Sequence, residues 1–446
     1  MSITPRKRIR HPRDVFYGWW IVASGFLVQL LNGSLLFHSF TAYFVFLQAE
    51  FGWSRTVLAG AFSMTRVESG LLGPIEGWLI DRFGPRAVMR VGIVLFGSGF
   101  ILLSRIDSIV GFYLAFAILA FGSALSGFLP VSAAVANWFA RRRATAMGIM
   151  MTGMGFGGLL VPIVTWSLTS FGWRETAFGS GILVLAVGLP AVQLMRHHPE
   201  QYGYLPDGEP MTPEQAEQPR EAFTGLTARQ ALRTSSFWFL SLGHSVALLI
   251  VGAAMVHQIP HMVEGVGLSI QTAGIVVAFL MAMVIIGQLA GGPIGDRFEK
   301  RYVVAGCMLG HSIALVIFAL ATNLIAVVAF ALLHGLAWGI RGPLLNSIRA
   351  DYFGRTAFAT IMGFSSLIIM GGMTIGPLFA GAMADWLGDY RISFIVLAVA
   401  TALGSLLFLM ARPPVLPEPS GPEMPESTLD RVTAKADEET VPSRAR

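Results

Sequence analysis

Twelve apolar stretches, each long enough to cross a lipid bilayer, occupy most of this 446-residue chain. A helix needs about 20 predominantly apolar residues to span about 30 Å of hydrocarbon. Charged residues make up only 13% of the chain, whereas soluble domains contain about one quarter. The sequence therefore predicts an all-α polytopic membrane protein, with helices at approximately 17–47, 55–80, 87–105, 109–138, 144–170, 175–195, 236–263, 270–295, 302–321, 324–350, 356–384 and 391–411.

The basic residues predict the orientation of these helices, because cytoplasmic loops carry an excess of Lys and Arg. If both termini are cytoplasmic, the N-terminus and the loops on its side hold 20 of the 31 Lys and Arg, with Arg349 and Arg355 among them, and the C-terminal tail holds five. The opposite side holds only Arg55, Arg105, Arg174 and Arg391. We expect a multi-pass protein of the cell (inner or plasma) membrane with both ends in the cytoplasm. The net charge of +5 then reports topology and no nucleic-acid partner.

A polar segment rich in Pro, Glu and Gln separates the sixth and seventh apolar stretches. It is too polar to bury a core of its own, and the similar C-terminal tail is expected to be disordered. The predicted divisions are a basic N-terminus at 1–16, a six-helix bundle at 17–195, a linker at 196–235, a second six-helix bundle at 236–411 and a tail at 412–446.

The two halves repeat one another in sequence. The pattern Gly-x-x-x-Asp-Arg-Phe-x-x-Arg follows the second helix at 77–86 and the eighth helix at 292–301. Prolines and aromatic residues of the first half also recur in the second, with offsets of 213 to 216 residues. Chance matches would not hold one register through six helices, so we infer an internal duplication of two parallel halves.

A basic turn precedes a helix with one face of small residues. Three arginines, 141–143, end the fourth apolar stretch, as expected where the chain turns in water beside a membrane. A face of small residues lets a second helix approach closely. Behind the turn, such residues recur at helical spacing at Ala144, Gly148, Thr152, Gly155, Gly158 and Pro162.

These features resemble the major facilitator superfamily, and the resemblance covers residues 15 to 411. Within that superfamily, Trp-Phe-x-Arg-Arg-Arg-x-Thr-Ala-x-Gly at 138–148, with Gly153 and Gly157, resembles the helix-five signature of the monocarboxylate transporter family. The Tyr-Gly-Trp-Trp at 17–20 is similar to that family's signature in helix one. The resemblance implies two bundles around a cavity lined by helices one, four, seven and ten, and movement of small organic acids, often with a proton.

The chain departs from the resembling families at two substrate contacts. Monocarboxylate transporters carry a substrate-contacting arginine in helix eight, where this chain has Gln288 at or near the corresponding place. The related oxalate/formate exchangers use a lysine in helix eleven, and 356–384 contains no lysine.

Arg341 is the candidate for substrate binding, because a charge at mid-membrane costs about 2.5 to 3.5 kcal/mol on insertion scales and marks a functional site by default. His334, Trp338 and Arg341 are spaced by four and three, so they form one stripe on the tenth helix. The guanidinium could clamp a carboxylate while the indole covers an apolar substrate tail. The alternative is a structural arginine held by a carboxylate or by helix-end carbonyls.

Two further charges, Arg66 and Glu68, fall within the second apolar stretch. Two residues apart, they point about 200° away from one another around a helix. Arg66 shares a face with Gly70, Gly73 and Gly77, which places it toward the junction of the halves, with a gating or interface role and substrate contact as equal alternatives. Glu68 is the candidate proton carrier, with a carboxyl satisfied by neighbouring hydroxyl or amide groups as the alternative.

His38 and His257 occupy matching places in the two halves. Monocarboxylate transporters carry a lysine near His38, so this histidine could replace that cation in binding substrate or protons. His257 and Gln258 precede Pro260, which frees a backbone carbonyl that a ligand could use. Packed, hydrogen-bonded histidines are the alternative for both positions.

The repeated loop motif predicts charge networks that close one end of the protein in one conformation and break in the other. Positive-inside topology alone is the alternative. The residues concerned are Asp81 with Arg82 and Arg86, and Asp296 with Arg297 and Arg301.

Other apparent motifs carry no chemistry. A Gly-x-Gly-x-x-Gly pattern at 153–158 lies inside a membrane helix with no preceding strand, so it is not a dinucleotide site. His257 and His261 have metal-ligand spacing, but Pro260 interrupts the helix and no third ligand is evident, so we expect no metal. With one cysteine, no nucleophile–base pair and no cofactor motif, the sequence does not predict an enzyme.

The sequence thus predicts a secondary active transporter that moves a small organic monocarboxylate with a proton by alternating access. Its expected partners are the substrate, protons and the lipid bilayer, and we expect it to work as a monomer. Exchange of organic anions and export of larger amphipathic compounds stay open as alternatives. A receptor that binds ligand without translocation is the alternative from another class.

Overall fold

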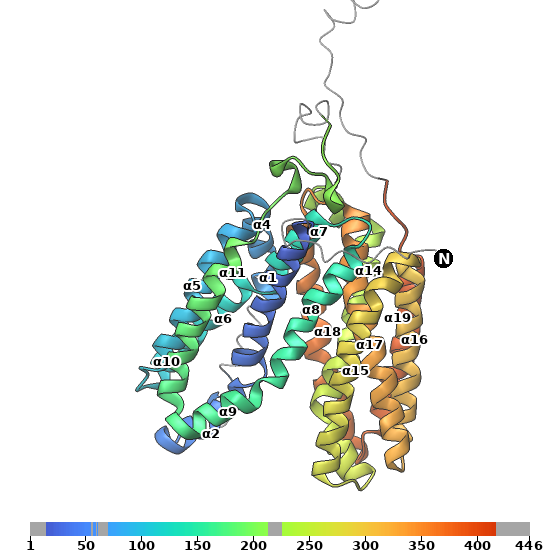
Figure 1. The fold of residues 1–446 in the computed structure, drawn as a ribbon. Coiled ribbons are helices and arrows are strands. Elements are labelled where there is room, and N and C mark those ends of the chain that lie inside the picture. Colours follow the sequence, from blue (N-terminus) through green and yellow to red (C-terminus); the bar gives the residue numbers. More distant parts are fainter. Residues whose placement is uncertain (1–14, 55–56, 59, 61–69, 213–224, 416–446) are drawn as a thin grey trace, which may run out of the picture.

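The computed structural model describes residues 15–54, 57–58, 60, 70–212 and 225–415, and their regular structure is helical (Figure 1). Among these residues, 11 helices are long and apolar enough to cross a membrane. The predicted all-α membrane fold is confirmed, and the observed spans follow the predicted stretches closely. They are Gly18–Phe51, Pro85–Leu103, Ile109–Trp138, Arg143–Phe171, Trp173–Gln193, Ser235–Gly265, Ile270–Arg297, Lys300–Ala319, Leu324–Phe353, Phe358–Leu387 and Arg391–Met410.

The predicted second helix lies only partly within the described residues, where its end is α4. The N-terminal bundle of Figure 1 is built from segmented helices, several of which share one span. Its α-helices are α1 (Gly18–Leu31), α2 (Phe40–Phe51), α4 (Gly73–Phe83), α5 (Pro85–Leu103), α6 (Ile109–Ser126), α7 (Phe128–Trp138), α8 (Arg143–Leu159), α9 (Val161–Phe171), α10 (Trp173–Leu183) and α11 (Leu189–Gln193). A π-helical segment, η2 (Asn32–Phe37), follows α1, and another, η3 (Val184–Gly188), joins α10 to α11.

The C-terminal bundle consists of longer helices whose starts are fixed by local capping. The side chains of Thr234, Ser269 and Asn323 accept backbone N–H bonds at the first turns of α14, α15 and α17, as N-cap residues do. At Pro260 the α-helix gives way to a π-helical turn, η7 (His261–Gly265). The helices are α14 (Ser235–Pro260), α15 (Ile270–Arg297), α16 (Lys300–Ala319), α17 (Leu324–Phe353), α18 (Phe358–Leu387) and α19 (Arg391–Met410).

Glycine determines how closely several helices approach one another. The small-residue face predicted on α8 lies against two helices, since Gly148 faces the backbone of α15 at Gln288 and Gly153 faces the backbone of α1 at Phe26. The crossing of α5 and α6 is equally close at Gly122. Close backbone approach of this kind is the main source of packing energy between helices in lipid.

The two bundles meet at one end of the molecule and separate toward the other (Figure 1). They are joined by α4 packed on α18 and by α8 packed on α15. The linker lies over the end where the bundles meet, which we call the linker end. At the opposite end, α9 and the start of α15 diverge in the view of Figure 1.

The first part of the linker is packed onto the bundles through two short 3-10 turns, η4 (Pro199–Tyr202) and η5 (Pro206–Gly208). The guanidinium of Arg196 lies between two aromatic rings, 3.6 Å from the centroid of Tyr17 and 3.9 Å from that of Tyr202. Further along the linker, a short helix, α13 (Ala228–Leu232), leads into α14, and the backbone N–H of Leu226 donates a 2.8 Å hydrogen bond to the Phe353 carbonyl. The described parts of the linker therefore contact both bundles at the linker end.

The glycine packing makes a stability prediction. A Cβ atom at Gly122 would lie 2.6 Å from the Cα of Phe96, whereas a Cβ at Gly179 would meet nothing within 4 Å. We therefore expect Gly122→Leu to destabilise the protein by about 1 to 3 kcal/mol, as overpacking typically does, and Gly179→Leu to have little effect. Thermal unfolding of both variants in detergent tests this. Equal midpoints for the two variants would contradict it.

Candidate functional site

A cavity of about 320 Å³ lies between the bundles, with walls from α4, α6, α7 and α8 on one side and α14, α17 and α18 on the other. Most of its wall is apolar, and a few polar side chains interrupt it. Such walls are typical of small-molecule sites, where a few polar groups orient the ligand. The lining residues are Gly73, Glu76, Ala124, Phe128, Leu129, Met151, His244, Leu248, Trp338, Arg341, Gly342, Asn346, Met362, Ser366 and Ile369.

Arg341 lies in the cavity wall with its side chain 1% exposed. Its Nε and Nη1 atoms are buried and have no hydrogen-bond partner among the residues that the structure describes. A buried cation without a partner is strongly unfavourable, because neither water nor an opposite charge compensates it. Glu76 of α4 is the acidic side chain among the lining residues, so the cavity holds a buried guanidinium and a buried carboxyl in opposite walls.

Trp338 lies one turn before Arg341 on α17 and lines the same cavity. The predicted stripe thus places an indole beside the guanidinium. The third member, His334, is 1% exposed and is absent from the cavity wall. Its Nδ1 atom lies 3.1 Å from Nδ1 of His311 on α16, inside the C-terminal bundle.

A second buried arginine, Arg349, lies two turns beyond Arg341 on α17. Its assignment to the loop after the tenth helix is wrong, because α17 continues to Phe353 and Arg349 is 1% exposed. Its guanidinium donates to the Leu345 carbonyl, to Ser365 Oγ and to His244 Nδ1, each at 3.1 Å. His244, which lines the cavity, is thereby held by an arginine behind it.

Sequence reasoning did not find Arg349, His244, Glu76 or Asn346. Arg349 stood at the end of an apolar stretch, and an arginine in that place is normally counted among the basic residues of a cytoplasmic loop. Asn346 follows Arg341 by five residues on the same helix, but its place in the cavity wall depends on where α8 and α18 pack. Glu76 is 7% exposed and belongs to α4, in the half opposite Arg341.

The other predicted ligand residues lie elsewhere in the described structure. His38 Nε2 is 3.2 Å from the Met154 carbonyl, and His257 Nε2 is 2.9 Å from the Pro377 carbonyl. Gln258 is buried beside His257 on α14, with 5% of its surface exposed. None of these three is in the cavity wall formed by the described residues. Arg66 and Glu68 lie outside the described residues.

The two repeated aspartates join one bundle to the other. Asp81 on α4 accepts hydrogen bonds from the backbone N–H groups of Ala359 and Thr360, at 3.1 and 2.8 Å, and from Thr360 Oγ1 at 2.6 Å. It therefore caps the start of α18 in the opposite bundle, where a carboxylate also interacts favourably with the helix dipole.

Asp296 on α15 makes the same contacts in the other direction. It accepts from the backbone N–H groups of Ala144 and Thr145, at 2.9 and 3.1 Å, and from Thr145 Oγ1 at 2.6 Å. The carboxylate thus caps the start of α8 in the N-terminal bundle. Each bundle thus supplies an aspartate that caps a helix of the other bundle, and we call these two contacts the reciprocal caps.

The expected pairing of these aspartates with their own motif arginines is wrong in this conformation. Arg86 donates to the carbonyls of Met195 and Gln193, and Arg301 pairs with Glu299 at 2.5 Å. Arg82 lies over the ring of Trp78, while no ion pair of Arg297 is seen in the described part of the chain. The carboxylates instead satisfy helix N–H groups that would otherwise lack partners.

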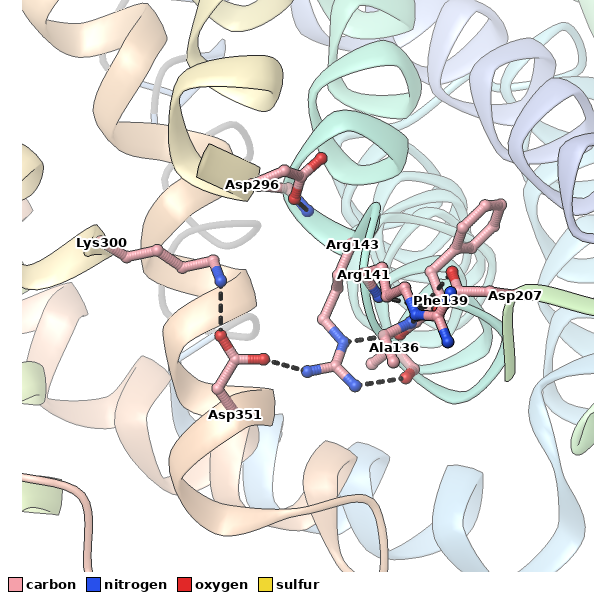
Figure 2. A network of polar contacts seen from close by, with 10 residues as sticks. Ala136, Phe139, Arg141, Arg143, Asp207, Asp296, Lys300 and Asp351 are labelled. Atoms are coloured by element: carbon pink, nitrogen blue, oxygen red, sulfur yellow. Dashed lines mark hydrogen bonds and ion pairs between the residues drawn. The ribbon is translucent and has the colours of Figure 1, made fainter. Parts of the chain in front are cut away.

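Ion pairs around the three-arginine turn reinforce the linker end (Figure 2). Figure 2 shows Arg143 bound to Asp351 of the C-terminal bundle, whose other carboxylate oxygen accepts from Lys300 at 2.7 Å. Arg143 also donates to the Phe139 carbonyl at 2.8 Å. Asp207 of the linker accepts from the backbone N–H of Arg141 at 2.8 Å, so the linker caps this turn.

The described residues thus form two helical bundles that meet at one end around a cavity with a buried arginine, and 11 of their helices are long and apolar enough to cross a membrane. The chain belongs to the major facilitator superfamily, which its sequence matches over residues 22–259 and 240–435. It is therefore assigned to a family of transporters and not of enzymes.

Known relatives and structures agree with this assignment. The chain is 26% identical over 403 residues to monocarboxylate transporter 13 of Bos taurus, covering 88% of this chain and 89% of that protein. It is 27% identical over 424 residues to monocarboxylate transporter 11 of Mus musculus, with 91% and 90% covered. The fold is similar to the human organic anion transporter MFSD10, with a TM-score of 0.63, 17% identity, and 90% and 100% covered. It is also similar to the fucose:proton symporter FucP of E. coli, with a TM-score of 0.69, 16% identity, and 89% and 100% covered.

The reciprocal caps predict how the joint opens. Replacing an N-cap Asp by Ala costs about 0.5 to 2 kcal/mol, so Asp81→Ala or Asp296→Ala should shift the equilibrium roughly two- to thirty-fold toward separation at the linker end. Spin labels at the exposed positions Ala87 and Tyr302, in a Cys307→Ser background, should report a longer distance. Asp385→Ala, at the far end of α18, is the matched control. Unchanged distances in both cap variants would contradict the prediction.

Proposed function

We propose that this protein is a secondary transporter that moves a small organic monocarboxylate together with a proton by alternating access. The observation that supports this most directly is the Arg341 guanidinium, which lines an interbundle cavity, with Nε and Nη1 lacking hydrogen-bond partners among the described residues. A carboxylate bound in the cavity would place a negative charge beside this cation.

The cavity wall suggests the rest of the substrate. Phe128, Leu129 and Trp338 present apolar surface around the cation, so a short apolar tail would be shielded from water there. A volume of about 320 Å³ is at the small end of ligand pockets, which favours a small acid over the larger amphipathic compounds. Similarity to monocarboxylate transporters over most of the chain supports the same class of substrate.

We further propose that the linker end faces the cytoplasm, in the cell membrane, because the basic residues gather on that side. In this orientation the described conformation is closed to the cytoplasm by the caps of Asp81 and Asp296. Opening toward the cytoplasm would require both caps to break. One chain supplies both walls of the cavity, so we propose a monomer as the working unit.

Direct substrate contact by His38, His257 and Gln258 remains a proposal that requires another conformation. In this one, His38 and His257 contact backbone carbonyls of neighbouring helices. The proton role of Glu68 and the gating role of Arg66 rest on the sequence alone.

Transport by purified protein in liposomes tests the proposal. Labelled lactate, pyruvate and phenylacetate should accumulate when the outside is made more acidic, and a proton ionophore should abolish accumulation while leaving exchange intact. If uptake of the labelled acid is independent of the proton gradient but is stimulated by unlabelled anion inside the liposomes, the result would favour exchange of organic anions. Binding without movement of any label across the membrane would favour a receptor.

Arg341 substitutions provide a sharper prediction. Hydrogen bonds to charged groups contribute about 1.5 to 3 kcal/mol, so Arg341→Gln should weaken substrate affinity roughly ten- to a hundred-fold. Arg341→Lys should recover part of it, because lysine keeps the charge but not the planar fork. Affinity is measured by titration calorimetry with the acid that gives the fastest exchange. Arg105→Gln, on an exposed loop, is the control. Unchanged affinity in Arg341→Gln would rule out this residue as the anion site.

A further inference from the structure

Two buried histidines form a hydrogen-bonded pair that the proposed anion site does not use. His311 on α16 is 0% exposed and His334 on α17 is 1% exposed. Their Nδ1 atoms are 3.1 Å apart, and the ring centroids are 4.6 Å apart at an interplanar angle of 67°. A bond between two such nitrogens requires one to donate a proton and the other to accept it.

One nitrogen of the pair has no partner. His311 Nε2 is buried and makes no hydrogen bond with any residue that the structure describes. When His311 donates from Nδ1, its Nε2 atom carries a lone pair and is a free base. A proton taken up there would leave the bond between the two rings intact.

The pair lies close to the candidate anion site. The His334 ring centroid is 6.3 Å from that of Trp338, which lines the cavity, and Arg341 lies two turns beyond His334 on the same face of α17. Along α17, Trp338 therefore lies between His334 and Arg341, and its indole forms part of the cavity wall.

The neighbouring helices supply few other ionisable groups. Cys307 lies one turn before His311 on α16, and Arg341 is the charge on α17 that acts on the pair. The described ionisable groups of α15 are Asp296 and Arg297 at its linker end, and α19 has only Arg391 at its start. On α14, His244 is engaged by Arg349. His257, also on α14, contacts the Pro377 carbonyl. Glu76 of α4 lines the same cavity as Arg341, so the charge balance around the pair depends on Arg341 and on what neutralises it.

We propose that the His311–His334 pair is the proton-binding site of the transport cycle and that Arg341 couples it to the substrate, an inference that rests on the proposed anion transport. With the cavity empty, Arg341 repels a second positive charge in this poorly polarisable interior. A bound carboxylate neutralises Arg341 and removes that repulsion. One proton then adds to Nε2 of His311 as one anion binds, and the proton and the anion are released together. The proton and the monocarboxylate together carry no net charge.

The test uses the full-length protein in liposomes with labelled lactate, pyruvate and phenylacetate. His311→Asn keeps a polar group near the place of Nδ1 but cannot take up a proton. We expect accumulation driven by an acidic exterior to fall at least tenfold, while exchange of internal for external acid in the same liposomes shows that the variant is folded. His261→Gln is the matched control, since His261 is a buried membrane histidine whose Nε2 lies 2.8 Å from the Phe318 carbonyl.

A second readout is proton uptake by detergent-solubilised protein in weakly buffered solution when the acid is added as its sodium salt. We expect about one proton per chain for wild type and His261→Gln, and none for His311→Asn. Proton-driven accumulation that survives in His311→Asn overturns the proposed proton site and leaves anion transport standing. Exchange by the wild type without any proton uptake also overturns the proposed proton site and leaves anion transport standing. A wild type that exchanges none of the three acids overturns the proposed function and the inference together.

Discussion

The absence of hydrogen-bond partners in hydrocarbon is the constraint on which this structure depends. Helices satisfy their own backbone groups, but a buried guanidinium must find its partners in the protein or in a ligand. On α17 two arginines, two turns apart, meet this requirement differently. Arg349 is surrounded by a carbonyl, a serine and a histidine, whereas Nε and Nη1 of Arg341 have no hydrogen-bond partner among the described residues. The first arginine is built into the fold, and in our proposal a bound carboxylate compensates the second.

The same constraint explains how the two bundles are held together reversibly. A helix start exposes N–H groups that need acceptors. Asp81 and Asp296 supply those acceptors from the opposite bundle, so separation at the linker end uncovers both the carboxylates and the helix starts. Water can satisfy these groups at the membrane surface, which keeps the difference between the joined and separated states small. A joint made only of apolar surface would resist opening onto water.

The sequence predicted what is encoded locally and missed what depends on tertiary contact. Apolar length located the spans, and the spacing of Trp338 and Arg341 predicted that they share a helix face. The caps of Asp81 could not be foreseen, because its partners are 278 and 279 residues away in the other bundle. His311 carries no local signal, since its significance arises only when α16 packs on α17 and brings His334 within 3.1 Å. Arg349 was counted as a loop charge because it stood at the end of the predicted helix 324–350, and its partners His244 and Ser365 come from other helices.

In the proposed mechanism, Arg341 also links exchange of substrates with net transport. When the bundles rock around an empty cavity, Arg341 must be carried across without a counterion, whereas a bound carboxylate removes that penalty. The loaded carrier should therefore reorient more easily than the empty one, which by itself favours exchange. Net transport requires the empty carrier to return, and this is easier if no extra proton remains on the imidazoles near Arg341. Whether the protein exchanges or accumulates its substrate thus depends on one quantity, the free energy of closing the empty cavity over Arg341.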